Sequence, residues 1–177
     1  MKDSNNTALT GPANPDRESW ARPGDPLELR LWLRMLTCST LVENHVRTLM
    51  RSGFDTTLPR FDLMAQLANS PRGMKMSDLS RRMMVTNGNI TGITDQLERD
   101  GLVERIKVDT DRRSCLILLT AKGRQSFRQM SAAYQGWISE LFEGVPASRR
   151  ERLYELLGEF KKAGRDALPQ SGATPSD

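Results

Sequence analysis

The chain has 177 residues, with 26 Lys and Arg against 22 Asp and Glu, two cysteines and a single histidine. This length suits one domain that buries its core unaided, and so few Cys and His residues leave little material for a zinc site or a disulfide framework. No stretch approaches the roughly 20 apolar residues of a membrane span and no signal peptide is recognisable, so we expect a cytoplasmic protein without metal or cofactor.

The basic excess is concentrated in the middle of the chain. Residues 72–128 hold 12 basic and 7 acidic residues, whereas the remainder holds 14 and 15. A local excess of this kind is typical of a surface that binds polyanions. A solvated basic surface would give the same count, so charge alone leaves both readings open.

Both ends of the chain have the composition of disordered tails, and residues 25–163 are predicted to form the ordered domain. Residues 1–24 and 164–177 are rich in Asn, Pro, Gly, Ser and Thr. Order is expected to begin with a helix over residues 26–52, with Asp25 as its N-cap and Gly53 as its stop. About 27 residues is long for a globular helix, which suggests packing beyond its own domain.

Residues 57–120 read as a helix-turn-helix followed by a β-hairpin. A second helix fits "LPRFDLMAQLAN", and a third follows with Ser77 as its cap. Thr86 is a good N-cap for a fourth helix that ends before Gly101, with Ile90, Ile93 and Leu97 inward. The runs "LVERIKV" and "SCLILL" are β-prone and flank a turn.

Two further helices are expected over residues 121–163, because apolar residues recur there at spacings of three and four. The predicted order is therefore α-α-α-α-β-β-α-α. This is a mainly helical fold with a small β-hairpin.

The outer face at the start of the fourth helix carries Asn87, Gly88, Asn89 and Thr91. These residues are poor helix formers, by up to about 1 kcal/mol each. Asn can pair with adenine, Thr can contact a thymine methyl group, and Gly permits close approach, so the set suits a reader of the DNA major groove. A loosely formed helix start with a cluster of capping residues would look the same.

The turn between the two β-prone runs carries Asp109, Asp111, Arg112 and Arg113. If the fourth helix lies in a major groove, the hairpin reaches the adjacent backbone, where arginines meet phosphates or the minor groove. The aspartates cannot face phosphate, so we expect one of them to hold an arginine in position by a charge-assisted pair. A solvated turn is the alternative, since Asp is common in turns.

The segment from "GNITGITDQLERDGLV" through "DTDRRS" to "LTAKG" resembles the winged helix-turn-helix core of the MarR family of transcriptional regulators. The resemblance implies a homodimer formed by the helices over 26–52 and 121–163. It places the third and fourth helices on a double-stranded DNA operator, with the hairpin as the wing. The expected DNA-binding residues are Ser77, Thr86, Asn87, Gly88, Asn89, Thr91, Arg112 and Arg113, with Asp109 and Asp111 bracing the wing.

The resemblance also implies an effector, a small aromatic acid or an aromatic acyl-CoA thioester, that releases a repressor from DNA. Arg30 and Arg34 repel each other at i, i+4 and have only Glu28 nearby in sequence, so an anionic ligand is one way to compensate them. Ordinary solvated arginines are the alternative. The candidate ligand residues are Arg30, Trp32, Arg34, His45, Phe61 and Met64.

Other classes of protein have less support. One histidine, no nucleophile elbow, no phosphate-binding loop and no metal-ligand spacing argue against an enzyme. An RNA-binding or protein-interaction winged helix without ligand response is the alternative function. An Asn and Thr face at a helix start favours duplex DNA, whose major groove admits a helix as that of RNA does not.

Overall fold

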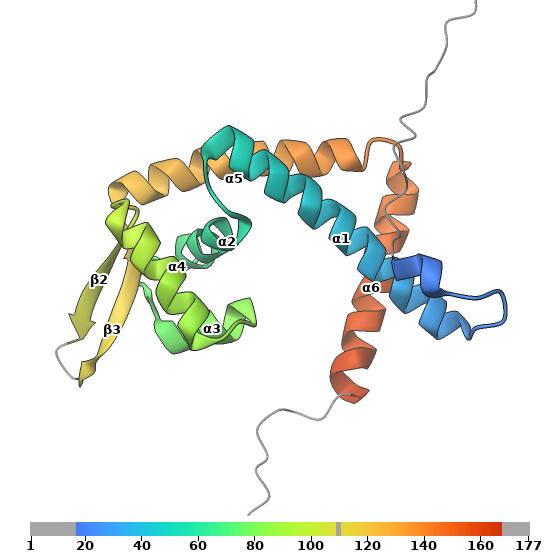
Figure 1. Cartoon of the computed structure of the whole chain (residues 1–177), viewed down its shortest axis with the longest axis horizontal. Helices are drawn as coiled ribbons and strands as arrows, with labels where there is room; N and C mark the ends of the chain where they lie inside the picture. The colour runs from blue at the N-terminus through green and yellow to red at the C-terminus, as the bar shows by residue number, and fades with distance from the viewer. Residues whose placement is uncertain (1–16, 109–110, 168–177) are drawn as a thin grey trace, which may run out of the picture. The chain divides into compact units, whose positions relative to one another are not determined.

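The computed structural model describes residues 17–108 and 111–167, with the backbone alone at 108 and 111–114. Two compact units are formed, one ending at Tyr134 and one beginning at Gln135. The elements in chain order are η1 (Arg17–Trp20), α1 (Leu27–Phe54), α2 (Leu58–Ala68), β1 (Met74–Lys75), α3 (Met76–Met83), α4 (Asn87–Arg99), β2 (Val103–Val108), β3 (Asp111–Leu119), α5 (Ala121–Leu141) and α6 (Ala147–Ala167) (Figure 1). The predicted fold class is thus confirmed. No described helix is long and apolar enough to cross a membrane.

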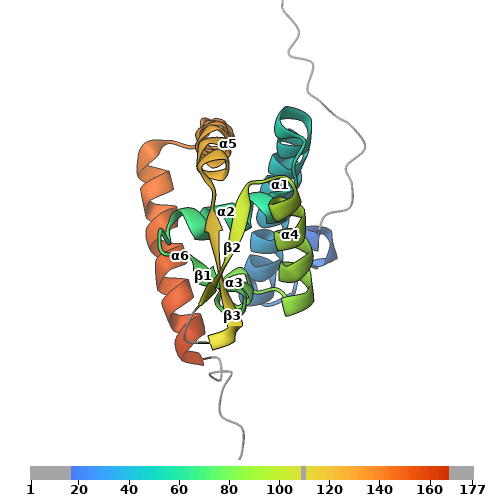
Figure 2. The same cartoon turned by 90° about the vertical axis from the view of Figure 1, so that its left-hand side faces the viewer.

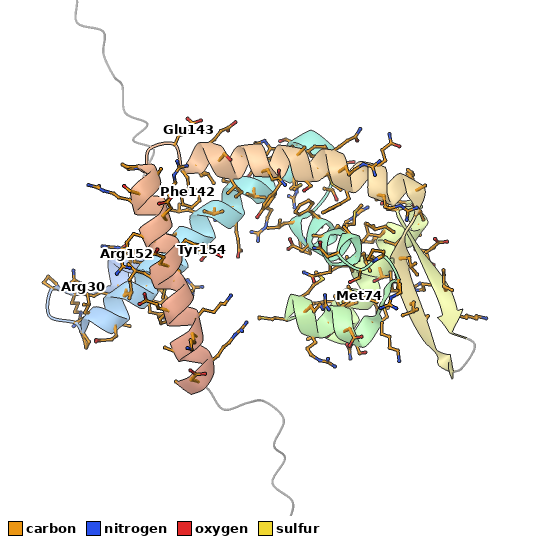
Figure 3. The ribbon with its side chains drawn as sticks, turned by 180° about the vertical axis from the view of Figure 1, so that it is seen from behind. Arg30, Met74, Phe142, Glu143, Arg152 and Tyr154 are labelled. Carbon is orange, nitrogen blue, oxygen red and sulfur yellow. The ribbon has the colours of Figure 1, made fainter. Side chains whose placement is uncertain are left out.

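The predicted hairpin forms within a three-stranded antiparallel sheet of order β1-β3-β2. Val103 pairs with Leu119 at its base, and the register shifts between Lys107 and Val108 towards the tip. The third strand, β1, was not predicted, because two residues are too short for a period-two pattern. Met74 of β1 pairs with Ile117 and its side chain is buried (Figure 3).

The core of the first unit lies where α2, α3 and α4 cover the sheet. Each element contributes a side chain that is less than 1% exposed. These include Leu63 and Met64 from α2, Leu79 from α3, Ile90 and Leu97 from α4, and Ile117 from β3. Burial of each such side chain contributes about 1.5–3 kcal/mol to folding. This core holds α3 and α4 in fixed positions.

Part of the segment predicted as a disordered tail is ordered. Residues 17–20 form a 3-10 helix against α1. Glu18 pairs with Arg34, and the Glu18 backbone N–H donates to Thr37 Oγ1 at 3.2 Å. The sequence could not indicate this order, because it depends on polar contacts between residues 16 to 19 positions apart.

The start of α1 also differs from the prediction. Pro26 occupies the N-cap position, and no side chain caps the helix. The Asp25 carboxylate instead accepts a hydrogen bond from the Arg22 backbone N–H at 2.7 Å. Asp25 therefore closes the turn that joins η1 to α1.

Gly123 makes the tightest glycine contact, at the start of α5. A Cβ added there would lie 1.9 Å from the Leu102 carbonyl oxygen, so backbone would have to move. We expect Gly123→Ala to lower the free energy of unfolding by about 1–3 kcal/mol, as measured by denaturant titration. Gly92→Ala is the matched control, because a Cβ on Gly92 of α4 meets no atom within 4 Å. That change should stabilise the chain by about 0.5–1 kcal/mol, and a similar loss in both variants would contradict the close contact.

Candidate nucleic-acid interface

The turn between α3 and α4 is held by two hydrogen bonds between Ser80 and Val85. The Ser80 hydroxyl donates to the Val85 carbonyl oxygen at 2.6 Å, and the Val85 backbone N–H donates to the Ser80 carbonyl oxygen at 3.2 Å. Met84 lies between them in the left-handed region, with φ of 55°. The two helices are thereby fixed to each other as a helix-turn-helix pair.

Thr86 caps α4, as the sequence predicts. Its hydroxyl oxygen accepts a hydrogen bond from the Asn89 backbone N–H at 3.4 Å. The Thr91 hydroxyl donates to the Asn87 carbonyl oxygen at 3.0 Å, which ties down the next turn. The side chains of Asn87, Asn89 and Thr91 are exposed, and so is Gly88. A polar, sterically open face therefore stands at the start of a well-formed helix.

The opposite face of α4 is buried, with one change from the prediction. Ile90 and Leu97 are inward as expected, but Thr94 takes the place predicted for Ile93. The Thr94 hydroxyl lies 3.7 Å from the sulfur of Met76 on α3. Ile93 is half-buried and lines a groove beside the helix. The prediction chose Ile93 because it is the apolar residue of the two. The position that faces α3 is that of Thr94, which a pattern of apolar residues does not detect.

Arg105 of β2 ties the hairpin to α4. It forms ion pairs with Asp95 and Glu98, which lie one turn apart on α4. The hydrogen bond with Asp95 raises the pKa of the Arg105 guanidinium, and the charge of Glu98 adds to this effect. Figure 2 shows α4 beside the β2 strand that carries the arginine. The sequence analysis did not predict these ion pairs. Two acidic residues spaced i, i+3 on a predicted helix, followed by an arginine on the next predicted strand, were the pattern that could have indicated them.

A groove of about 570 Å³ runs along the outer side of α4, where α1 ends and α2 begins. Gly88, Asn89 and Gly92 of α4 form one wall, and Arg47 and Arg51 of α1 stand beside them. Sequence reasoning did not connect these arginines with α4, because some 40 residues separate them along the chain. Two basic residues therefore line the groove beside the polar face of α4, and one of them, Arg47, also pairs with Glu43 on α1.

Ser77 is exposed in the first turn of α3, but it does not cap that helix. The N-cap position belongs to Lys75, and no side chain makes a capping hydrogen bond there. The reason is that β1 leads directly into α3, so the helix begins at Met76, earlier than its polar residues suggest. Ser77 nevertheless lies on the helix-turn-helix surface.

The residues predicted to form the wing tip fall outside the part of the chain whose side chains are described. Asp109 is outside the described residues, and the side chains of Asp111, Arg112 and Arg113 are as well. The backbone of residues 111–113 belongs to β3. Bracing of a wing arginine by an aspartate therefore remains a prediction.

Comparison with known proteins identifies this arrangement. Residues 56–115, which include the helix-turn-helix pair and most of the hairpin, match the MarR family model. The transcriptional activatory protein BadR of Rhodopseudomonas palustris is 32% identical over 153 residues, which cover 82% of this chain and 86% of BadR. A MarR family transcriptional regulator from Silicibacter pomeroyi, of known structure, is 32% identical with a TM-score of 0.65, over 77% of this chain and 94% of that one. The chain belongs to the MarR family.

Two other proteins are similar to this MarR-family regulator over shorter or more divergent stretches. The homoprotocatechuate degradative operon repressor of Escherichia coli is 33% identical over 98 residues, covering 55% of this chain and 66% of the repressor. The structure of CouR from Rhodococcus jostii, bound to p-coumaroyl-CoA, aligns with a TM-score of 0.65 at 20% identity, over 77% of this chain and 94% of CouR. The fold and the class of transcriptional regulator inferred from the sequence are confirmed.

The residues predicted to bind an effector in this MarR-family chain do not come together within its first unit. Arg30, Trp32 and Arg34 are exposed near the start of α1, whereas Phe61 and Met64 are buried on α2. Figure 3 shows Arg30 far from the lobe that contains Met74. At a rise of about 1.5 Å per residue, some 30 Å of α1 separates Arg30 from its buried C-terminal end. His45 is exposed midway along α1.

The expectation that Arg34 has no acidic neighbour other than Glu28 is wrong, so its charge is no argument for an anionic ligand. Arg34 pairs with Glu18, and the hydrogen bond from Arg34 lowers the pKa of the Glu18 carboxyl. The charge of Arg30 lowers the pKa of Glu18 further, so Glu18 faces both arginines. Their compensation comes from η1, a segment that the sequence presented as a tail.

Residues 17–108 and 111–167 contain no group of three or more His, Cys, Asp or Glu side chains that could hold a metal ion. Cys38 is exposed on α1, and Cys115 is half-buried on β3. Both are free thiols. The candidate site of this MarR-family chain is thus a surface of polar and basic side chains.

An aromatic cluster forms where α2 meets α5, and the acidic residue Asp62 of α2 lies close enough to act on its tyrosine. Phe61 stacks on Phe127 and Tyr134, with ring centroids 5.5 and 5.0 Å apart. Asp62 is an exposed residue, but its carboxyl is partly desolvated on the side that faces the protein; this raises its pKa to about 6, and the charge of Glu43 adds to the shift. Desolvation also raises the pKa of Tyr134, and the charge of Asp62 adds to that. This cluster could not be predicted from the sequence, because Asp62 reads as an ordinary polar position on α2.

Asp62 should make stability depend on pH. Its folded-state pKa lies above the usual value near 3.8, so its favourable contribution is full below about pH 4 and is lost as the pH rises through about 6. We expect Asp62→Asn to raise the Tm by about 1–3 °C at pH 7.5 and to leave it unchanged at pH 3.5. Glu104→Gln, at an exposed position on β2, removes the same charge as a control. An equal pH-dependent gain in both variants would assign the effect to net charge and contradict this account.

Proposed function

We propose that this MarR-family regulator binds a double-stranded DNA operator as a homodimer and is a repressor released by a small aromatic carboxylate or an aromatic acyl-CoA thioester. One observation carries the DNA-binding part. The start of α4 exposes a face of amide, hydroxyl and glycine residues, while its other face is anchored in the core. A helix presented in this way suits the major groove of duplex DNA.

The proposed DNA contacts divide by chemistry. Asn87, Asn89 and Thr91 read base edges, with Gly88 allowing the backbone to come close. Ser77 and Thr86 bind backbone phosphates near the helix starts, and Arg112 and Arg113 of the wing reach phosphates or the minor groove. We add Arg47 and Arg51 as phosphate contacts, since they stand beside the polar face of α4.

Exposed apolar side chains on α6 support the homodimer. Five large side chains of this helix are between 44% and 81% exposed, namely Leu153, Tyr154, Leu156, Leu157 and Phe160. At the α5–α6 corner, Phe142 and Tyr154 help to line an apolar hollow of about 320 Å³ (Figure 3). Contiguous exposed apolar surface of this kind normally marks an interface, and regulators of palindromic operators are two-fold symmetric.

The effector class is proposed on the names of relatives. One is a repressor of a homoprotocatechuate degradative operon, and CouR has been solved with p-coumaroyl-CoA bound. Both names carry an aromatic acid or its thioester. Release requires that the effector bind the free form more tightly than the DNA-bound form, because equal affinity for both shifts nothing.

The α6 surface gives a direct test of the dimer. We expect the chain to sediment as a dimer at micromolar concentration, and Leu157→Glu to shift it towards the monomer, because a charge would be buried in the interface. Lys162→Glu introduces the same side chain further along α6, on the opposite, polar side of the helix, and should leave the dimer intact. A wild-type monomer at this concentration, or a dimer that tolerates Leu157→Glu and not Lys162→Glu, contradicts the assignment.

Base reading and backbone binding should respond differently to substitution. The operator is first located by footprinting on the DNA that flanks the regulator's own gene. Asn89→Ala should then cost about 1–3 kcal/mol on the operator and little on random DNA of equal length, as measured by fluorescence anisotropy.

The wing variants are the comparison for Asn89. Arg113→Ala should weaken binding to both DNAs, and Asp111→Ala should reproduce part of that loss if the aspartate braces the arginine. An equal loss on operator and random DNA for Asn89→Ala would show that Asn89 does not read bases.

A further inference from the structure

The turn between α3 and α4 contains a methionine in a backbone conformation that disfavours side chains (Figure 1). Met84 is the C-cap residue of α3, with φ of 55° and ψ of 38°, in the left-handed region. A Cβ atom makes this conformation costly, which is why glycine most often occupies it at the end of a helix. The turn therefore requires this backbone conformation, and the methionine side chain makes it harder to adopt.

The side chain of Met84 does not pack in the core either. Met84 is 93% exposed, more than any other large apolar residue whose side chain the structure describes. Its neighbours Met83 and Val85 are half-buried, so they carry the packing of the turn. An apolar side chain stabilises a fold when it leaves water, and Met84 remains in water. Neither the backbone nor the core explains a methionine at this position.

The turn holds Met84 at a defined place on the lobe. Ser80 and Val85 make two hydrogen bonds across it. The helices on both sides are anchored, since Leu79 of α3 and Ile90 of α4 are fully buried. A group on a fixed backbone has less freedom to lose when it binds a partner. Met84 thus presents an apolar side chain that is ready to make a contact outside the chain.

Met84 lies next to the face of α4 that is proposed to read bases. Thr86, the N-cap of α4, is two positions further along the chain, so the Cα atoms of Met84 and Thr86 are at most about 7.6 Å apart. Val85, between them, lines the same groove as Gly88 and Asn89. A duplex that receives the start of α4 in its major groove therefore comes within reach of the Met84 side chain.

The chemistry of methionine restricts what it can contact on such a duplex. Its thioether carries no charge and donates no hydrogen bond, so it cannot bind a phosphate. The C5-methyl group of thymine is the apolar feature by which bases differ in the major groove. A flexible, unbranched and polarizable side chain adapts well to a small apolar target. Thymine is therefore the base that Met84 can distinguish.

We infer that Met84 is a specificity-determining residue, which packs on the C5-methyl group of a thymine beside the base pairs read by α4. The inference rests on the proposed DNA binding and extends it from polar contacts on the helix to an apolar contact from the turn before it. It explains the unfavourable backbone and the exposed thioether together, because DNA and not the core covers this side chain. In a two-fold symmetric complex each half-site carries one such thymine.

The test uses the full chain and the operator located by footprinting. Each thymine in the protected region is replaced in turn by uracil, which lacks the C5-methyl group and keeps the same base pairing. Affinities of the wild type, Met84→Gly and Met84→Leu for each duplex are measured by fluorescence anisotropy. Thr91→Ser is the matched control, because it removes a methyl group from α4 itself and leaves the turn unchanged.

We expect the wild type to lose roughly three- to tenfold in affinity when uracil replaces one particular thymine of a half-site. Met84→Gly should lose a similar factor on the unmodified operator and be insensitive to uracil at that position. Met84→Leu and Thr91→Ser should both remain sensitive to uracil there. The Tm of Met84→Gly should equal or exceed that of the wild type, because glycine suits the left-handed backbone.

Three results would each overturn the inference. The first is an unchanged affinity of Met84→Gly for the operator, which would leave the exposed methionine to a protein partner. The second is an equal response of the wild type and Met84→Gly to uracil at every position. The third is a clear fall in the Tm of Met84→Gly, which would show that Met84 packs within the chain. DNA binding would survive all three, whereas failure of the wild type to bind any operator would overturn the proposed function itself.

Discussion

The burial of one stripe of α4 is the constraint on which the DNA-binding lobe depends. Ile90, Thr94 and Leu97 are all fully buried, and together they join α4 to the helices and sheet around it. Because one face is committed to the core, the start of the helix can carry Asn and Gly residues that would be poor choices for stability alone. Packing against the core thus provides the stability that the helix propensity of these residues does not.

Polar ties hold the edges of the same lobe. Arg105 joins the hairpin to α4, and Arg60 of α2 pairs with Asp100, where α4 ends. Lys122 of α5 donates to the Asp100 carbonyl oxygen at 2.8 Å, and the Thr120 hydroxyl donates to the Gly101 carbonyl oxygen at 2.7 Å. The end of α4 is therefore the junction at which α2, the hairpin and α5 meet. A movement of α5 near this point can therefore be transmitted both to α4 and to the hairpin.

Much of this lobe could be predicted from the sequence, because its signals are local. Thr86 and Gly101 mark the two ends of α4, and the β-prone runs mark the hairpin. The Asn and Gly residues at the start of α4 stand out because they violate helix propensity. The family followed from the combination of these features with the wing motif and was confirmed by comparison.

The parts that escaped prediction depend on contacts between distant segments. The stacking of Phe61 on Phe127 and Tyr134 joins α2 to α5, and it leaves no periodic pattern in the sequence. The effector residues were chosen because Arg34 lacked an acidic neighbour along α1. Glu18, 16 residues earlier and in a segment with the composition of a tail, is that neighbour in space.

The Glu18–Arg34 pair has a practical consequence for anyone who prepares shortened versions of this protein. Composition alone recommends trimming everything before Asp25, as is usual when crystals or spectra are wanted. Such a cut would remove Glu18 and leave Arg30 and Arg34 as a bare cationic strip on α1. Nucleic acid and anionic resins bind strips of that kind without regard to sequence. A trimmed chain would then bind DNA of any sequence more strongly than the intact regulator does, so the cut is better placed before Arg17.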